Sequence, residues 1–249
     1  MAGISRFLDN SDIAERIHIA KGMMRGVEGV HKFGAVPAMS NGVTGTVWDK
    51  SDTLYPWSAF DTPGILTVAT TTSNGSASTG DNGKTIIIIG LDENFNPQQD
   101  TITVSGGVGT GTKIFGRVYR AYITNGDTNA TQWRVSRGGT EVLRVSIGKS
   151  QTLMALYTVP AKKYGYLMSG TASIQAGADA TVDMYVRYGG TGAFRIGHSL
   201  EISGMGGPYN YNFTIPTELP PKTDIDIRTS VRSNNARLTA AFDIVLLSY

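Results

Sequence analysis

The sequence predicts an all-β protein that begins with a short helix, and three observations support this prediction. Glycine makes up 31 of 249 residues, about 12% against a usual share of about 7%, which indicates many tight turns. After residue 63, β-branched and aromatic residues alternate with polar ones in short runs. Helical spacing of apolar residues is clear within the first 26 residues, which differ from the rest of the chain.

Residues 1–30 are expected to form an N-terminal helical arm. Asp12 and Glu15 resemble a capping box, which is typical of a helix start. The apolar positions that follow at helical spacing are Ile13, Ile17, Ala20 and Met24. A helix of about ten residues is not stable alone, so this stripe must pack on its own β-domain or on a neighbouring subunit. Ile13, Ile17 and Met24 are therefore candidate interface residues.

Residues 31–64 are expected to form an extended strap over the sheet. The segment is punctuated by Gly and Pro, yet it contains Phe33, Trp48, Tyr55, Trp57 and Phe60. An irregular segment with so many rings is not a free linker. The rings either complete the core of the domain or face a partner, because Trp and Tyr dominate interface hot spots. Phe33, Trp48, Tyr55 and Trp57 are the interface candidates.

Residues 65–249 are expected to form a single β-sandwich of about 12 to 13 strands, because no helical pattern separates the strand-like runs. The runs are 65–71, 84–90, 101–105, 113–124, 131–136, 141–147, 151–159, 165–175, 181–188, 194–203, 209–215, 223–231 and 236–249. A period of two fixes which residues share a face but not which strands pair. A jelly roll and another Greek-key sandwich both remain open.

Two runs near the C-terminus show their faces clearly. Ile225 and Ile227 point one way, while Asp224, Asp226 and Arg228 point the other, which predicts one buried and one solvated face. In the last run, both faces are apolar: one carries Leu238, Ala240, Phe242, Ile244 and Leu246, and the other carries Val245 and Leu247. Such a strand is expected to be central in the sandwich or covered by another subunit.

No catalytic constellation is found, and the protein is expected not to be an enzyme. The run from Gly80 to Thr85 ends like a phosphate-binding loop but lacks its first glycine and precedes a strand, so a turn at Asn82-Gly83 is predicted. The glycine run 106–111 is read as a flexible loop, since the third glycine of the dinucleotide fingerprint is missing. No cofactor is expected.

Metal and nucleophile patterns are also weak. There is no cysteine, and the three histidines are isolated from one another, so a histidine-rich metal site is not expected. The cluster 92–94 is read as a surface turn rather than a calcium site. Adjacent His198 and Ser199 point to opposite faces of a strand, which excludes a hydrolytic pair.

Two surface patterns leave alternatives open. Asp224 and Asp226 share a face, as glycosidase acids can, but the neighbouring Arg228 favours a solvated face. Tyr209, Tyr211 and Phe213 alternate on one strand face and could either pack in the core or form a stacking platform for sugars. A carbohydrate-binding receptor module is therefore one hypothesis for function.

Charge and hydropathy limit the partners that are expected. The 22 basic and 20 acidic side chains give a formal net charge of +2, which provides no electrostatic footprint for nucleic acid or an anionic membrane. No signal-peptide core or membrane-spanning run of about 18 apolar residues occurs. Neither nucleic acid nor membrane is an expected partner.

Several segments resemble a family of virion structural proteins from tailed bacteriophages, including marine and cyanobacterial phages. Together these segments span most of residues 31–249. They are His31-Lys32-Phe33-Gly34, Tyr55-Pro56-Trp57, LDENFNPQQDTITVSG (91–106), FGRVYRAYITNG (115–126), QTLMALYTVPAKKYGYL (151–167) and IPTELPPKTDIDIR (215–228). The helical arm lies outside the resemblance, which transfers no functional residues.

The resemblance implies a non-enzymatic β-sandwich component of a virion, assembled in the host cytoplasm and present in many copies. The preferred expectation is a tail or connector protein that forms rings with itself and contacts portal, adaptor, nozzle or fibre proteins. The alternative is a capsid decoration protein that binds the major capsid protein. The arm and strap suit a ring, because subunits that reach onto their neighbours make head-to-tail contacts that can close.

Overall fold

The structure is a computed structural model that describes residues 12–126, 128–205, 207–233 and 235–249. Within these residues it contains sixteen β-strands, one α-helix and two short 3-10 helices, so the predicted all-β class with a preceding helix is confirmed. Among the described helices, none has both the length and the apolar character that crossing a membrane requires.

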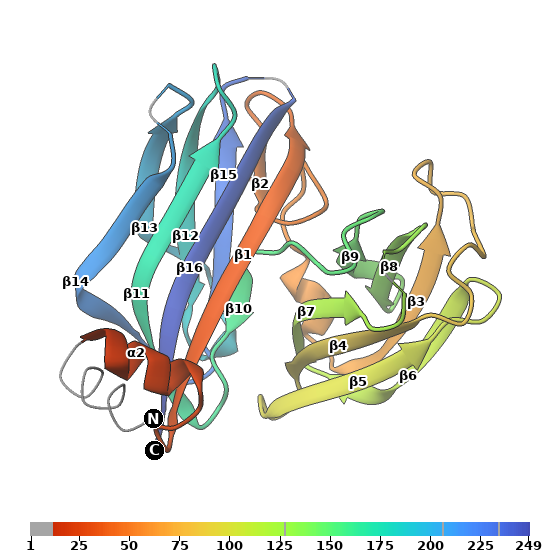
Figure 1. Ribbon diagram of the computed structural model, residues 1–249, viewed down its shortest axis with the longest axis horizontal. Helices are drawn as coiled ribbons and strands as arrows, with labels where there is room; N and C mark the ends of the chain where they lie inside the picture. Colours follow the sequence, from red (N-terminus) through yellow and green to blue (C-terminus); the bar gives the residue numbers. More distant parts are fainter. Residues whose placement is uncertain (1–11, 127, 206, 234) are drawn as a thin grey trace, which may run out of the picture.

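Along the chain, the α-helix is followed by strands β1 to β16, with one short 3-10 helix after β2 and another after β12 (Figure 1). They are α2 (Asp12–Ala20), β1 (Val27–Met39), β2 (Thr44–Thr46), η1 (Trp57–Phe60), β3 (Gly64–Thr71), β4 (Thr85–Leu91), β5 (Pro97–Thr103), β6 (Val108–Phe115), β7 (Arg117–Ile123), β8 (Gln132–Arg137), β9 (Thr140–Val145), β10 (Leu156–Thr158), β11 (Lys163–Ile174), β12 (Asp179–Arg187), η2 (Tyr188–Gly190), β13 (Arg195–Ser203), β14 (Tyr209–Leu219), β15 (Asp224–Val231) and β16 (Ala236–Ser248).

The strands form two sandwiches side by side rather than the single one expected over residues 65–249 (Figure 1). The terminal sandwich combines sheet A, in the order β1-β16-β11-β14, with sheet B, in the order β10-β15-β12-β13 and with β2 paired to β15. The inserted sandwich combines sheet C, β6-β3-β8-β9, with sheet D, β5-β4-β7. Two separate hydrophobic cores explain this division, because each pair of sheets buries its own apolar faces.

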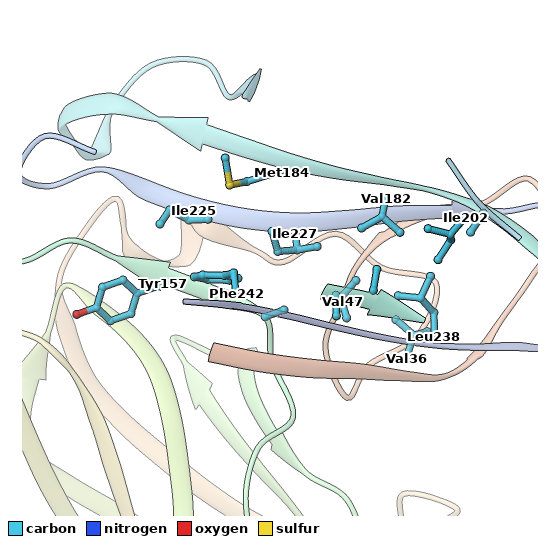
Figure 2. Packing of buried hydrophobic residues seen from close by; sticks show 14 of the residues in the cluster. Val36, Val47, Tyr157, Val182, Met184, Ile202, Ile225, Ile227, Leu238 and Phe242 are labelled. Carbon is cyan, nitrogen blue, oxygen red and sulfur yellow. The ribbon is translucent and has the colours of Figure 1, made fainter. Parts of the chain in front are cut away.

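The core of the terminal sandwich lies between sheets A and B. Figure 2 shows Val182, Ile225 and Ile227 from sheet B above Leu238 and Phe242 from sheet A. Each of these side chains alternates with residues that point away from the core, as a period of two requires. The alternation predicted for both C-terminal runs therefore generates the two inner faces of this sandwich.

β16 occupies the position predicted from its two apolar faces. It lies between β1 and β11 and pairs antiparallel with both. Its inward residues Leu238, Phe242, Ile244 and Leu246 are buried, whereas Leu247 on the outer face is 38% exposed. The C-terminal strand is therefore central in sheet A, as expected.

The expected arm and strap have a different organisation in the structure. β1 crosses the expected boundary at residues 30 and 31 and pairs with β16 along its length, and β2 adds to sheet B. β1 was not predicted from the sequence because two glycines and a proline interrupt the alternation of apolar and polar residues along it. Gly34 is required there, since a Cβ at this position would lie only 2.5 Å from the Val47 carbonyl oxygen.

The expected strand at residues 113–124 is two strands that belong to different sheets. β6 ends at Phe115 and β7 begins at Arg117, so the chain crosses from sheet C to sheet D at Gly116. A Cβ on Gly116 would lie 2.6 Å from the Asp92 carbonyl oxygen. The glycine run 106–111, expected to be a loop, contains the first half of β6.

Candidate functional site

The described residues contain no grouping of three or more His, Asp or Glu side chains that could hold a metal ion. The run from Gly80 to Thr85, which resembles a phosphate-binding loop, forms the predicted turn at Asn82-Gly83. Inside this run, buried Asp81 accepts hydrogen bonds from Thr131 and Trp133, and Lys84 Nζ lies 2.8 Å from the Asp81 carboxylate. Burial alone would raise the pKa of Asp81, but these hydrogen bonds hold it well below its usual range. The charged pair of this loop therefore anchors the turn.

The predicted interface residues fall into two groups in the structure. Trp48, Tyr55 and Trp57 are 1%, 3% and 5% exposed and pack edge to face in the core of the inserted sandwich. Phe33 and Met24 remain 38% and 37% exposed, and Ile17 is half-buried. The side chain of Ile13 lies outside the described residues. The structure therefore places the three core rings in a structural role and leaves the other described candidates near the surface.

A buried ion-pair network joins the two sandwiches, and its centre is Asp224 at the start of β15. The carboxylate accepts hydrogen bonds from Arg117 Nε and Nη2, at 2.9 and 3.1 Å, and from Arg187 Nε and Nη2, at 2.9 and 2.6 Å. Thr158 Oγ1 donates a further bond of 2.6 Å. Because Arg117 belongs to β7 and Asp224 to β15, this paired carboxylate holds the inserted sandwich against the terminal one.

Asp226 makes a second connection across the same junction. Its carboxylate accepts hydrogen bonds from Trp57 Nε1 at 3.0 Å, from Thr46 Oγ1 at 2.8 Å and from Arg228 Nε at 2.9 Å. The solvated face predicted for Asp224 and Asp226 is wrong, since both residues are completely buried. Charge on a strand usually marks a wet face, but here guanidinium and indole donors from distant segments replace water.

Aromatic rings cover the guanidinium groups of the junction. Arg187 and Arg228 lie 4.6 and 4.8 Å from the centre of the Phe194 ring, and Arg117 lies 5.1 Å from that of Phe95. The Phe194 ring also contacts the Trp57 ring, with 5.4 Å between centroids. Stacked rings exclude water from the ion pairs and strengthen them. With its charges paired in this way, the junction acts as a clamp between the two sandwiches.

Two further ionisable side chains are buried outside this clamp, Lys32 and Asp49. Lys32 on β1 reaches across to donate a hydrogen bond to the Tyr119 carbonyl on β7, and burial, aided by nearby Arg120, lowers the pKa of Lys32 to about 7. Asp49 accepts hydrogen bonds from Ser146 Oγ at 3.0 Å and from the Leu153 amide, yet burial raises the pKa of Asp49 to about 7. Both groups therefore titrate near neutral pH.

The outer face of sheet A carries a groove of about 660 Å³ between the sheet and α2. Figure 1 shows α2 lying across one end of this face, over β11 and β16. The groove is lined by Arg16, Ile19, Ala20, Gly29, Val30, His31, Met168, Ser169, Asn212, Phe213, Asp243, Ile244 and Val245. On its floor, Asp243 accepts a bond from Ser169 Oγ and contacts His31 Nδ1, both at 2.6 Å. Ser169 bonds to the carboxylate and not to the imidazole, so this trio lacks the nucleophile–base contact of a hydrolase.

The possible sugar platform lies at the open side of the terminal sandwich. Tyr211 and Phe213 on β14 pack against His198 on β13, with ring centroids 4.8 and 5.4 Å apart. Tyr209 and Tyr211 are 41% and 37% exposed, while Phe213 contacts the core. These three β14 residues therefore close the gap between sheets A and B, and the Tyr209 and Tyr211 rings remain exposed to solvent.

Sequence reasoning missed the residues of the junction. No local signal connects Arg117 with Asp224, which are 107 positions apart in the chain. The alternation in the run 224–228 was visible, and its two aspartates and one arginine form one strand face. Whether such a face is wet or buried depends on what packs over it, which alternation does not encode.

Comparisons with known proteins add little to this geometry. No protein-family model matches the chain, and no curated protein matches it. Among solved structures, the chain is similar to one from the structure of infectious bursal disease virus Gx strain, with a TM-score of 0.22 and 9% sequence identity. The match covers 89% of this chain and 75% of that chain. At this TM-score it carries no argument about function, so the resemblance to phage virion proteins remains a prediction.

Proposed function

We propose that this protein is a non-enzymatic structural component of a virus particle that is present in many copies. Its place is the tail or connector of a tailed bacteriophage, as a ring-forming accessory protein. Its partners are further copies of itself and portal, adaptor, nozzle or fibre proteins. The observation that carries the proposal is the buried junction around Asp224 and Asp226, which makes one body of two sandwiches.

A fixed junction suits a particle component because symmetric assembly requires subunits of one shape. Two domains joined only by a linker would move relative to each other. These two sandwiches share a buried ion pair, a contact between the Trp57 and Phe194 rings, and hydrogen bonds. The carboxylate of Asp224 accepts hydrogen bonds from Thr158 and from both arginines, so its oxygens are used in holding the junction together. The geometry supports a mechanical role for the body.

The free strand edges offer surfaces for assembly. Within the described residues, β14 pairs with β11 alone and β13 with β12 alone, so both strands have an unpaired edge. Ile215 and Ile196 on these strands are 84% and 56% exposed. Unpaired strand edges are pairing hazards in a monomer, and coverage by a neighbouring subunit removes the hazard.

Negative-stain electron microscopy of the purified protein, combined with light scattering, tests the proposal. Closed rings are expected for a tail or connector protein. Trimers or monomers would contradict ring formation and favour the alternative, a capsid decoration protein that binds the major capsid protein. Antibody labelling of intact particles then locates the protein, and labelling along the head surface would exclude the tail position.

A carbohydrate-binding receptor module is the second candidate, favoured by the exposed rings of Tyr209 and Tyr211 beside His198. Aromatic faces at the rim of a sandwich can stack on sugars. Glycan-array binding that Tyr211→Ala abolishes, and that Tyr188→Ala retains, would support this function. Tyr188 is a suitable control because it is 48% exposed on η2, away from these β14 residues. An array without any bound glycan would exclude the candidate.

A further inference from the structure

The groove under α2 has the composition of a docking site for a short amphipathic segment. Its walls are apolar, with Ile19 on α2 and Val30, Met168 and Val245 on sheet A. Its charged side chains are Arg16 on α2 and the pair of His31 with Asp243 on the sheet. Asp243 is 50% exposed at its side chain, so it can accept another cation. An occupant should therefore be apolar on one side and carry one charge of each sign.

Residues 1–11, which lie outside the described part of the chain, have this composition. Their sequence contains Ile4, Phe7 and Leu8, a spacing of three and four that is typical of peptides docking in grooves. They also contain one cation, Arg6, and one anion, Asp9. Arg6 complements Asp243, and Asp9 complements Arg16, so segment and groove match in both apolar character and charge.

We propose that the groove under α2 binds residues 4–9 of a neighbouring copy of this chain, so that each subunit donates its N-terminus to the next. Eleven residues can extend over about 36 Å, against about 13 Å for the nine residues of α2, so the segment can reach beyond its own helix. The inference rests on the proposed multi-copy assembly. Donation to the next subunit makes a heterologous contact, which is the type that closes rings.

Cysteine cross-linking tests this contact directly, because the chain contains no cysteine of its own. Leu8→Cys is placed in one preparation and Asn212→Cys in another, since Asn212 lines the groove and is exposed. After mixing, exchange of subunits and mild oxidation, a covalent dimer on a non-reducing gel is expected. Val108→Cys, 59% exposed on β6 of the inserted sandwich, replaces Asn212→Cys as the control and should give no dimer with Leu8→Cys.

The same experiment separates the possible failures. A double variant with both cysteines that links only within its own chain, while the mixed single variants do not link, would overturn donation to a neighbour. Absence of any link in an oligomer confirmed by light scattering would also overturn it, yet would leave the assembly proposal standing. A protein that stays monomeric at all concentrations would instead contradict the proposed function.

A charge exchange gives an independent readout. Arg16→Glu should weaken the oligomer, because Asp9 then meets a like charge. In light scattering during dilution, the variant should dissociate at a protein concentration at which the unmodified protein is still oligomeric. The double variant Asp9→Arg with Arg16→Glu should restore it. Arg25→Glu makes the same change of net charge at an exposed position outside the groove and should have no effect. Equal weakening by Arg16→Glu and Arg25→Glu, or no rescue by the double variant, would contradict the proposal.

Discussion

At the scale of single residues, buried charges dominate this protein. Asp224 and Asp226 are completely buried. Asp224 pairs with two arginines and Asp226 with one, and both also accept hydrogen bonds from neutral donors. A buried ion pair gives little net stability compared with an apolar pair, but loss of one partner leaves an uncompensated charge and is costly. The energetics of the junction are therefore best measured by removing one partner.

Asp224→Asn is expected to destabilise the protein by about 3–5 kcal/mol, because Arg117 and Arg187 both lose their buried counter-ion. Urea unfolding followed by tryptophan fluorescence measures the change. The matched control is Glu201→Gln, which breaks the exposed pair with Arg232 and should have little effect. If both variants unfold at the same urea concentration, the clamp is not a significant source of stability.

Lys32 predicts a dependence of stability on pH. Burial lowers its pKa from 10.5 to about 7 in the folded protein, so the folded state binds fewer protons than the unfolded chain between these values. The contribution of Lys32 to the free energy of unfolding therefore rises as pH increases from about 7 towards 10, where tyrosines also begin to titrate. Lys32→Met should flatten this rise in denaturant titrations across the window. An unchanged slope would show that the amine is not buried in this way.

At the scale of elements, the close approach of strands decides which residues are tolerated. β1 passes the segments at Val47 and Ala155 so closely that position 34 has no room for a side chain. Glycine at such a position weakens the local β-pattern, because it has no side chain to pack and costs entropy on folding. Gly34 therefore permits the close packing of β1 and also makes β1 difficult to recognise from the sequence.

Gly34→Ala is expected to destabilise the protein by at least about 2 kcal/mol, since the new Cβ meets backbone atoms that cannot move independently. Gly170→Ala on β11 is the control. The nearest atom to a Cβ there is the Ala241 carbonyl oxygen at 4.0 Å, so the change should be tolerated. Thermal unfolding followed by circular dichroism compares the two variants. Equal melting temperatures would contradict the close approach.

At the scale of the whole molecule, the two sandwiches have separate cores but a shared junction. Each core alone could support a folding unit, as each contains a continuous cluster of buried residues. The ion pairs at Asp224 and the bond from Lys32 to Tyr119 couple them. Unfolding of one sandwich exposes these charges on the other, so the two should unfold together.

Calorimetry is expected to show one unfolding transition for the unmodified protein. Removal of two inter-sandwich contacts, in the double variant Arg117→Ala with Lys32→Ala, should split it into two transitions as the sandwiches become independent. A control variant, Arg232→Ala, changes an exposed arginine that pairs within the terminal sandwich and should keep a single transition. Two transitions in the unmodified protein would show that the junction does not couple the cores.

The sequence by itself determined the all-β class, the N-terminal helix, which residues share a face in the two C-terminal strands, and the central place of the last strand. These properties follow from local periodicity, because a period of two assigns side chains to faces whatever the strand pairs with. It also identified the Asn82-Gly83 turn, since turn residues act through their own backbone.

The tertiary structure alone decided that there are two sandwiches, that β1 belongs to sheet A, and that Asp224 and Asp226 are buried. Each of these depends on contacts between residues far apart in the chain, such as Arg117 with Asp224 or Val36 with Leu238. The same alternating pattern fits a wet face and a face covered by arginines. Only the packing of the second sandwich over the first decides between them, because solvation is set by neighbours in space and not in sequence.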